Sequence, residues 1–262
     1  MDGAQKPSEK RLRQSERRNQ ILLELKLRPH IRITEMAQRF GVSTETVRRD
    51  MDRLSDDGLI ERAHGGATAG RYYPDFHQRS QDRLEERRAI GRRAADLVRP
   101  GDTVMIDSGS TTVQLARFLA FAETPCTVVT NSLTVAMTLG QSPAAEVILC
   151  PGDYHVSEAA VVGTDTVEYL ARYRVDRCMI GASGLTQDGI TEAVRGFAAV
   201  KRAMLAGSET SHLLIDSGKF GRRGLSQVGG LSGLSCVVTD RAPEGDLADA
   251  LATGGVGLEI AR

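Results

Sequence analysis

The 262-residue sequence has little cysteine, and this shortage excludes two classes of protein. Its four cysteines are too far apart for the close pairs that zinc ligands or a secreted disulfide framework show. They are Cys126, Cys150, Cys178 and Cys236. We therefore expect free thiols, no metal site built on cysteine, and a reducing compartment.

Long apolar runs and an excess of charge are also missing. The stretch MDGAQKPSEKRLRQSERR has no apolar core that could serve as a signal peptide, and no later stretch is long enough to span a bilayer. We expect a cytoplasmic protein without a membrane partner. The 34 basic and 34 acidic side chains cancel to a net charge of +0, so the whole molecule exerts no strong field on nucleic acid. Any charge argument must be local.

What is present is an ordinary globular composition, with 40% hydrophobic and 26% charged residues. The length favours two domains. Charge is uneven along the chain, since residues 1–34 hold nine basic and four acidic side chains. On its own such a run is typical of a solvated terminal arm, and we assign residues 1–16 to a basic N-terminal arm.

Three short helices are expected after this arm. The first covers residues 17–27 and ends near Pro29. Thr34 is the expected N-cap of the second helix, Gly41 supplies the turn after it, and Ser43 is the expected N-cap of the third. Each helix has one apolar stripe at helical spacing. The stripes consist of Ile21, Leu22, Leu25, Met36, Ala37, Phe40, Val47, Met51 and Leu54.

The opposite face of the third helix is polar and basic, with Thr44, Glu45, Arg48, Arg49 and Arg53. A helix, a tight glycine turn and a second helix is the geometry that places the second helix in the major groove of DNA. Residues 59–67, LIERAHGGA, predict a strand and a glycine turn, which together form a small wing. Many small helical subdomains contain one such helix-turn-helix spacing. The wing, the Arg48–Arg49 pair and the basic arm together favour DNA binding.

These residues resemble a known family. The segment 42–67, VSTETVRRDMDRLSDDGLIERAHGGA, resembles the DNA-binding domain of the DeoR family of bacterial transcriptional regulators. Its pattern VS-x-x-TVRRD-x-x-x-L, followed by HGGA, is far more restrictive than a generic helix-turn-helix. We assign residues 17–67 to a winged helix-turn-helix domain that binds double-stranded operator DNA. The candidate DNA-contacting residues are Thr34, Ser43, Thr44, Glu45, Thr46, Arg48, Arg49, Arg53, Arg62 and His64.

The remainder of the chain predicts an α/β domain. Residues 68–82 have no sustained period and are interpreted as a linker. The segment 83–98, RLEERRAIGRRAADLV, predicts a charged helix with a solvated face. From residue 103 onward, short apolar runs alternate with helical stretches: TVMI, CTVVT, AEVILC, RCMIG, SHLLID and SCVVT. This alternation is typical of a largely parallel, Rossmann-like sheet, which binds ligands outside the carboxyl ends of its strands.

The turn 107–112, DSGSTT, directly follows one predicted strand and precedes a helix. Its glycine, hydroxyls and free backbone amides make a plausible phosphate cradle. The glycine-to-lysine spacing of a P-loop is absent, so nucleoside triphosphate hydrolysis is unsupported. Such a turn alone is more often a helix cap. Polar groups also follow or precede other strands, namely Asn131, Asp176, Gly181, Gly184, Glu192 and Asp216 to Phe220 with its Lys219. Each has an ordinary explanation as a turn former, cap or surface charge.

The same loops extend the resemblance across nearly the whole chain. MIDSGSTT, VVTNSLTVA, VVGTDTVEYL, DRCMIGASGL, AVKRAML and LLIDSGKFG resemble, in this order, the DeoR-family sensor domain, which is similar in fold to ribose-5-phosphate isomerase and glucosamine-6-phosphate deaminase. The resemblance implies that residues 83–262 sense an effector and mediate oligomerisation. It also implies a repressor of carbohydrate or polyol catabolic genes, without a cofactor, that a phosphorylated sugar or polyol releases from its operator.

Effector contacts are assigned through this resemblance. The phosphate is given to Ser108, Gly109, Ser110, Thr111, Thr112 and Lys219, and the rest of the pocket to Asn131, Gly181, Glu192 and Lys201. From its chemistry rather than from the resemblance, Asp107 is, like Glu192, a candidate acceptor of hydrogen bonds from sugar hydroxyls. Two positions depart from the family pattern. Pro151 precedes Gly152 where family members often have paired glycines, and Phe197 stands where an acidic residue is common. The departures leave the identity of the effector open.

A second class of function is a sugar-phosphate isomerase or deaminase with a fused accessory domain. Such an enzyme needs a general base and an acid within reach of the substrate. The candidate loops contain no histidine, and Asp107, Asp176 and Glu192 are their obvious acids. An isomerase does not require the N-terminal module, so we favour a regulator. Regulators with one winged domain usually pair, because a two-fold symmetric operator offers two half-sites, and we expect a homo-oligomer.

Overall fold

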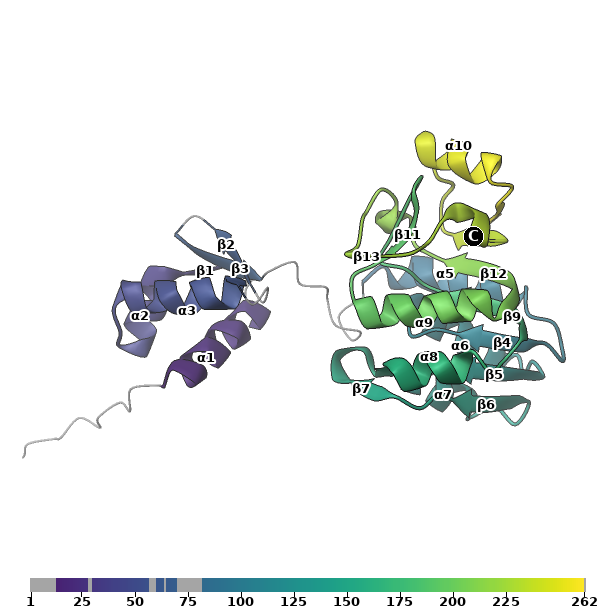
Figure 1. Ribbon diagram of the computed structural model, residues 1–262, viewed down its shortest axis with the longest axis horizontal. Coiled ribbons are helices and arrows are strands. Elements are labelled where there is room, and N and C mark those ends of the chain that lie inside the picture. Colours follow the sequence, from purple (N-terminus) through teal and green to yellow (C-terminus); the bar gives the residue numbers. More distant parts are fainter. Residues whose placement is uncertain (1–12, 28–29, 57–59, 64, 70–81, 262) are drawn as a thin grey trace, which may run out of the picture. The chain divides into compact units, whose positions relative to one another are not determined.

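The computed structural model describes residues 13–27, 30–56, 60–63, 65–69 and 82–261. The chain divides into two units, Met1–Tyr73 and Pro74–Arg262, and each is described by itself (Figure 1).

The N-terminal unit is a helix-turn-helix with a wing. Its elements are α1 (Gln14–Leu27), β1 (His30–Arg32), α2 (Ile33–Phe40), α3 (Thr44–Asp56), β2 (Ile60–Ala63) and β3 (Gly66–Ala69). The three strands form an antiparallel sheet in the order β1-β3-β2. The expected apolar stripes form the core between the helices and this sheet, with Leu22 at its partly buried margin. The sequence pattern did not predict β1, which pairs with the wing. Two predicted boundaries were also wrong, since α1 begins at Gln14, within the segment assigned to the arm, and Thr68 and Ala69, assigned to the linker, are the last residues of β3.

The caps of the helix-turn-helix are partly as expected. Gly41 adopts the left-handed conformation at φ 62°, and the Thr46 amide donates to Ser43 Oγ at 3.1 Å, so Ser43 caps α3. The prediction for Thr34 was wrong. The chain is still extended at Arg32 and helical from Ile33, whose amide donates to the Gly65 carbonyl, so Thr34 lies inside the first turn of α2.

The C-terminal unit is built on a parallel sheet of seven strands in the order β15-β14-β12-β9-β4-β5-β6. The strands are β4 (Thr103–Ile106), β5 (Cys126–Thr130), β6 (Ala145–Leu149), β9 (Val175–Ile180), β12 (Ser208–Leu214), β14 (Cys236–Thr239) and β15 (Gly257–Ile260). Six of these correspond to the six apolar runs in the sequence. The edge strand β15, whose residues are half-exposed, was not predicted. The α/β fold class is confirmed.

Helices cover both faces of the sheet. One face packs against α5 (Leu84–Ala95), α6 (Ser110–Phe121) and α7 (Leu133–Leu139). The other packs against α8 (Thr164–Leu170), α9 (Arg195–Ala206) and α10 (Asp246–Thr253). Figure 1 shows α8 and α9 in front of the sheet. The buried side chains of the two faces alternate along each strand, as Leu213 and Leu214 do in β12, because successive side chains point to opposite faces.

Smaller elements lie at the ends of the strands. They are the hairpin β7 (Asp153–His155) and β8 (Ala160–Val162), the sheet of β10 (Gly184–Thr186), β11 (Gly189–Glu192) and β13 (Ser226–Gly229), and the 3-10 turns η1 (Val156–Glu158), η2 (Ser217–Lys219) and η3 (Leu231–Gly233). The sequence pattern did not resolve them, since each is only three or four residues long.

The interpretation of residues 83–98 as a helix with a solvated face was wrong in part. Ile90 and Ala94 lie in the core, and the Arg87 side chain is only 4% exposed. Its guanidinium pairs with the Asp216 carboxylate at 3.3 Å, which offsets the cost of burying it. The helix α5 is therefore a core element that carries a buried charge.

All four cysteines are free and buried, as expected. Burial raises the pKa of the Cys150 thiol to about 12 and that of Cys236 to about 11, so neither is a ready nucleophile. Among the residues that the structure describes, no helix combines the length and apolarity needed to cross a membrane.

Candidate functional site

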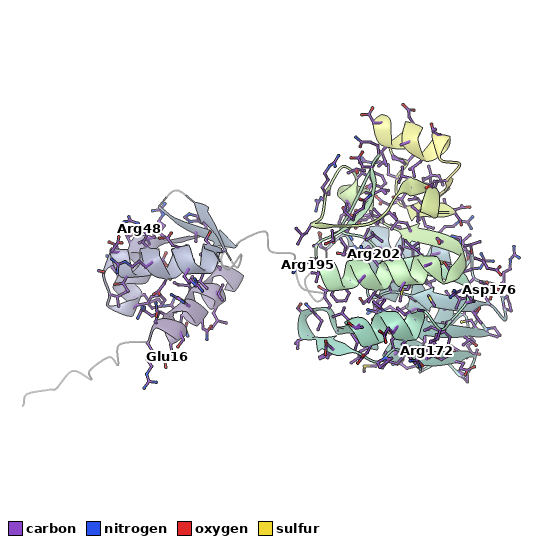
Figure 2. All side chains as sticks on the ribbon, in the orientation of Figure 1. Glu16, Arg48, Arg172, Asp176, Arg195 and Arg202 are labelled. Carbon is purple, nitrogen blue, oxygen red and sulfur yellow. The ribbon has the colours of Figure 1, made fainter. Side chains whose placement is uncertain are left out.

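The outer face of α3 carries the candidate DNA-contacting residues. Thr44, Glu45, Arg48, Arg49 and Arg53 are exposed there, and Figure 2 marks Arg48 on this unit. The Glu45 carboxylate pairs with Arg48 at 2.9 Å and with Arg49 at 3.4 Å. Exposed pairs of this kind contribute little free energy, so DNA phosphates can displace the carboxylate from both arginines.

The start of α3 borders an open depression of about 430 Å³ at the helix-turn-helix turn. Thr34, Ser43 and Thr44 are among its lining residues, so the structure brings these three together. Thr46 is placed differently from its neighbours. It is half-buried, and its hydroxyl lies 2.8 Å from Ser43 Oγ, where it completes the cap rather than facing outward.

Two candidates lie in the wing. Arg62 belongs to β2, and its side chain is not described, while His64 lies outside the described residues.

Buried ion pairs hold the N-terminal unit together. Asp50, on the inner face of α3, is almost fully buried and pairs with Arg17 at 2.8 Å and Arg18 at 3.2 Å. Glu24 in α1 is also buried and pairs with Arg39 of α2 at 2.5 Å. Part of the basic charge near the N-terminus therefore fixes α1 to the helix-turn-helix. These pairs could not be read from the sequence pattern, because they join residues far apart along the chain.

In the C-terminal unit, the loops after three neighbouring strands meet. Asp107 follows β4, Asn131 follows β5 and Gly181 follows β9. The Gly181 amide donates to Asp107 Oδ2 at 3.0 Å, and Asn131 Nδ2 lies 3.4 Å from Ser108 Oγ. The carboxyl edge of the sheet therefore brings these candidates together, as the topology of a parallel sheet requires.

The turn after β4 leads directly into α6. Gly109 is the N-cap residue, and its amide donates to Thr112 Oγ1 at 2.8 Å. Thr112 therefore uses its hydroxyl to close the turn. Ser110 and Thr111 begin the helix and are almost fully buried. The first amides of a helix lack intrahelical acceptors and carry the positive end of the helix dipole, so this end of α6 favours an anion.

A buried group of three charges lies beside this turn. Lys201 of α9 pairs with Asp107 and, at 3.3 Å, with Glu192 Oε2. Ser183 Oγ donates to Glu192 Oε1. Burial by itself raises the pKa of Glu192, but the charge of Lys201 and the hydrogen bond from Ser183 outweigh it, and the pKa lies below its ordinary value. Glu192 is therefore ionised. The group therefore places two acidic side chains around one lysine.

Two buried oxygens of this edge lack a hydrogen-bond donor among the residues that the structure describes. Asp107 Oδ1 and Asn131 Oδ1 are fully buried and accept no hydrogen bond from any described residue. Buried acceptors are nearly always satisfied, and each exception needs an explanation. Both oxygens belong to residues that contact the loop leading into α6. They are places where a ligand could donate hydrogen bonds.

Lys219 reaches the same edge from η2. Its Nζ donates to the Ala182 carbonyl at 2.6 Å, in the loop after β9. Its charge also contributes to the lowered pKa of Glu192, which shows that the two side chains lie in each other's field. A cation, a helix N-terminus and several acceptors are therefore gathered at one edge.

Asp176 does not belong to this group. It is the second residue of β9 and thus lies at the amino end of the sheet, where it accepts hydrogen bonds from the Thr103 amide at 2.7 Å and from Thr103 Oγ1 at 2.6 Å. These bonds lower its pKa. Figure 2 shows Asp176 and Arg195, the first residue of α9, at opposite ends of the unit. The expectation that Asp176 lies among the strand-end groups was wrong, because Asp176 precedes its apolar run and therefore stands at the amino end of β9, whereas the other groups meet at the carboxyl end.

The two departures from the family pattern lie near each other in the fold. Phe197 is buried in the first turn of α9 and packs edge-on against His155 of β7, with ring centroids 5.3 Å apart. Gly152 has φ 147°, and a Cβ there would lie 2.0 Å from Thr166 Oγ1. The second glycine of the usual pair is thus required here. Thr166 Oγ1 donates to the Pro151 carbonyl at 2.7 Å. A proline at position 151 still supplies this carbonyl, so the bond does not require a glycine there.

This combination defines a class of protein: a DNA-binding regulator with an α/β ligand sensor. Comparison with known proteins identifies the family. Residues 17–71 match the DeoR-like helix-turn-helix domain, and residues 82–241 match the DeoR C-terminal sensor domain. The chain belongs to the DeoR family of transcriptional regulators, as the resemblance implied.

Individual relatives extend over almost the whole chain. The glycerol-3-phosphate regulon repressor of Escherichia coli is 30% identical over 252 residues, which cover 95% of this chain and 100% of that protein. The HTH-type transcriptional repressor GlcR of Bacillus subtilis is 33% identical over 243 residues, 89% of this chain and 92% of that protein. These relatives are regulators, so the enzyme alternative is not supported. Ribose 5-phosphate isomerase A of Methanocaldococcus jannaschii is 15% identical, with 52% and 54% coverage and a TM-score of 0.39.

The sequence pattern missed a group of residues next to the site. Arg83, Arg87, Ser217 and Asp240 join α5 to the loop that carries Lys219. The only signal was the position of Asp216 directly after an apolar run. The arginines of residues 83–98 resembled an ordinary charged helix.

Proposed function

We propose that the protein is a homo-oligomeric, cytoplasmic repressor of carbohydrate or polyol catabolic genes that a phosphorylated sugar or polyol releases from operator DNA. One observation carries the effector half of this proposal. The carboxyl edge of the sheet combines the N-terminus of α6, the cation Lys219 and two buried acceptors without partners among the described residues. The family and its relatives, two of which are named as repressors, support the DNA half.

The chemistry of the edge favours a ligand with an anion at one end and hydroxyls at the other. The amides of Ser110 and Thr111 and the ammonium of Lys219 suit a phosphate. Asp107 Oδ1 and Asn131 Oδ1 accept but do not donate, so they suit hydroxyl groups. The ionised Glu192 carboxylate, next to Ser183 and Lys201, disfavours a second anionic group at its end of the ligand.

The DNA half rests on α3. We propose that Thr44 and Glu45, with Thr46 behind them, approach base edges in the major groove, because the first turn of a recognition helix enters deepest. Arg48, Arg49 and Arg53 face outward and are proposed to hold phosphates. Two-fold operators require two such helices, and this supports a dimer or a higher oligomer.

The experiment measures release of labelled DNA by fluorescence anisotropy, with DNA from upstream of the protein's own gene. Glycerol 3-phosphate and several hexose and pentose phosphates are titrated in, beside the same compounds without phosphate. We expect release by a phosphorylated compound and none by its unphosphorylated form. Thr111→Asp places a carboxylate where the phosphate sits, and Lys219→Ala removes the cation, so both variants should bind DNA normally and resist release.

A matched control is Arg223→Ala, which removes a nearby cation that pairs with Asp188 at the surface. This variant should be released like the wild type. Linkage gives a further check, because DNA must weaken effector binding by the factor by which the effector weakens DNA binding. If Thr111→Asp and Lys219→Ala release DNA at wild-type effector concentrations, the edge is not the effector site and its loops are ordinary helix caps.

A further inference from the structure

We propose that Arg83 and Arg87 are positioning residues that couple the Lys219 loop to the start of α5, and thereby to the chain segment that leads to the DNA-binding unit. The inference rests on the proposed function, since it concerns how occupation of that same edge is transmitted. It assigns the transmission to one group of contacts, which we call the α5 clamp: Arg83, Arg87, Asp216, Ser217 and Asp240.

The clamp joins the residue that precedes α5 to three residues of the sheet edge. Arg83 Nη2 donates to Ser217 Oγ and to Asp240 Oδ2, each at 3.2 Å, and its Nη1 lies 3.4 Å from Asp216 Oδ1. One turn later Arg87 pairs with Asp216 Oδ2 at 3.3 Å. Asp216 is 2% exposed, and these two arginines offset the cost of burying its carboxylate.

The other side of the clamp is the lysine loop itself. Asp216 and Ser217 stand immediately before Gly218 and Lys219, and the Lys219 amide donates to the Asp216 carbonyl at 3.0 Å. Asp240 fixes the start of η2, because its two carboxylate oxygens accept from the Ser217 amide at 2.6 Å and from Ser217 Oγ at 2.7 Å. A movement of the Lys219 backbone toward a bound phosphate would therefore shift the acceptors that hold Arg83.

Arg83 is held in an unfavourable conformation. Its φ of 49° and ψ of 42° place it in the left-handed region, which costs free energy for any residue with a Cβ and persists only where the surroundings hold it. The clamp supplies that hold. Arg83 also follows in sequence the segment 70–82, which stands between β3 of the wing and α5 of the sensor. If the clamp loosens, the backbone at Arg83 can relax, and the direction in which the chain enters α5 changes.

The structure offers a variant that opens the clamp without touching a charge. A Cβ at Gly218 would lie 2.1 Å from Arg83 Nη1, so Gly218→Ala must displace the guanidinium. Gly218 has no left-handed φ, and the backbone itself tolerates alanine. Gly233, in the similar 3-10 turn η3, has open space around its Cβ position. Gly233→Ala is therefore a matched control, and Arg88→Ala, which breaks only a surface pair with Glu85, is the control for Arg83→Ala.

The test compares effector binding with DNA release in the full-length protein. Glycerol 3-phosphate, glucose 6-phosphate and fructose 6-phosphate are the probes; their affinity is measured by calorimetry, and DNA release by anisotropy. We expect Gly218→Ala and Arg83→Ala to bind the probe with an affinity within about threefold of the wild type. The coupling factor, which is the factor by which the probe weakens DNA binding, should fall by about tenfold, a large part of a typical allosteric coupling. Arg83→Lys keeps the charge without the planar fork and should be intermediate. Both controls should match the wild type.

Hydrogen exchange gives a readout that needs no effector. The amides of the first turn of α5 should exchange faster in Gly218→Ala and Arg83→Ala than in Gly233→Ala. Three results would each overturn the proposal. They are unchanged hydrogen exchange in the clamp variants, full DNA release in both clamp variants, and a loss of probe affinity as large as the loss of coupling. Absence of release in the wild type would contradict the proposed function, whereas release that persists in the variants contradicts the clamp alone.

Discussion

The two units of the protein place their charged side chains in opposite ways. On the outer face of α3 the arginines are exposed, and their pairs with Glu45 lie in solvent. At the carboxyl edge of the sensor sheet, Asp107, Glu192 and Lys201 are nearly fully buried and neutralise one another in part. The same kinds of residue therefore serve different purposes. Exposed cations can exchange one partner for another at little cost, while buried ions are held in one arrangement.

This difference separates affinity from stability. A change on the face of α3 should alter DNA binding and leave folding intact. A change in the buried group should alter folding first, and effector binding with it. Variants of the two kinds therefore test the comparison directly, and the largest effects are expected where charge is buried.

The largest effect is expected for Lys201→Met. The substitution keeps most of the volume of the side chain but leaves Asp107 and Glu192 as buried carboxylates without their cation, which should cost about 3–5 kcal/mol of unfolding free energy. Urea denaturation followed by circular dichroism measures the change. Arg202→Met, at the next position of α9, removes an exposed guanidinium that donates to the Gln227 carbonyl and serves as the control. Equal losses of unfolding free energy in the two variants would show that burial of the charged group adds nothing to its effect on stability.

The second effect concerns pH. His212 is buried in β12 with both ring nitrogens unpartnered by the described residues, and burial, helped by the charge of Arg177, lowers its pKa from 6.5 to about 4. The unfolded chain takes up this proton more readily. His212 therefore contributes fully to stability above pH 6.5, and its contribution is lost as the pH falls toward 4, by about 3 kcal/mol in total.

Comparison with His212→Leu isolates this contribution. Both proteins are denatured with urea between about pH 7.5 and 4.5, the range in which the histidine of the unfolded chain titrates. As the pH falls, the stability of the wild type should decrease more steeply, because only the wild type has the titrating ring. The slopes decide the outcome rather than the absolute stabilities, which also reflect packing. Parallel slopes would mean that the ring is hydrogen-bonded or solvated when the protein is folded.

The third effect lies in the N-terminal unit and qualifies the comparison, because this unit has buried charge of its own. Asp50→Ala removes the acceptor of Arg17 and Arg18, both of which keep some contact with solvent. We expect a loss of about 2 kcal/mol, below the loss for Lys201→Met, since the stranded arginines can reach water. Thermal unfolding monitored by hydrogen exchange of α1 and α3 locates the change. Glu45→Ala, which removes the acceptor of two arginines on the exposed side of α3, is the control.

How far the sequence predicted these features depends on their range along the chain. The apolar stripes of Met36, Val47 and Met51 and six of the seven strands of the large sheet follow from local periodicity, and the structure places them as expected. The turn into α6 was recognisable because its residues are consecutive. In contrast, the pairing of Asp50 with Arg17 and of Arg87 with Asp216 joins distant segments, and a charged residue on a helix looks the same whether it is paired and buried or solvated.

The errors have similar causes. Thr34 is a good N-cap residue by type, but β1 pairs with the wing and fixes the start of α2 before it. Asp176 stands before its apolar run, so it lies at the amino end of β9, whereas a parallel sheet binds ligands at the carboxyl ends of its strands. Both errors come from interpreting a residue by its type and its neighbours rather than by the end of the element at which it stands.

The smallest effect on stability, and the sharpest test of the exposed face, is expected for Arg49→Ala. The Arg49 side chain is 78% exposed and pairs with Glu45 in solvent, so folding stability should stay within about 0.5 kcal/mol of the wild type. Binding to DNA should weaken for all sequences. If Arg49 holds a phosphate, the slope of log K against log salt should become less steep by about one for each phosphate that the protein no longer neutralises.

Anisotropy titrations at several salt concentrations measure this slope, and Thr44→Ala provides the contrast. Removal of a base contact at Thr44 should relax specificity at one base pair and leave the salt slope unchanged, because no phosphate counterion is involved. An unchanged slope for Arg49→Ala, with selective loss of affinity at one position of the operator, would assign Arg49 to base recognition. The arginines of the exposed face would then recognise bases as well as phosphates. The two units would differ only in whether their charged side chains are exposed or buried.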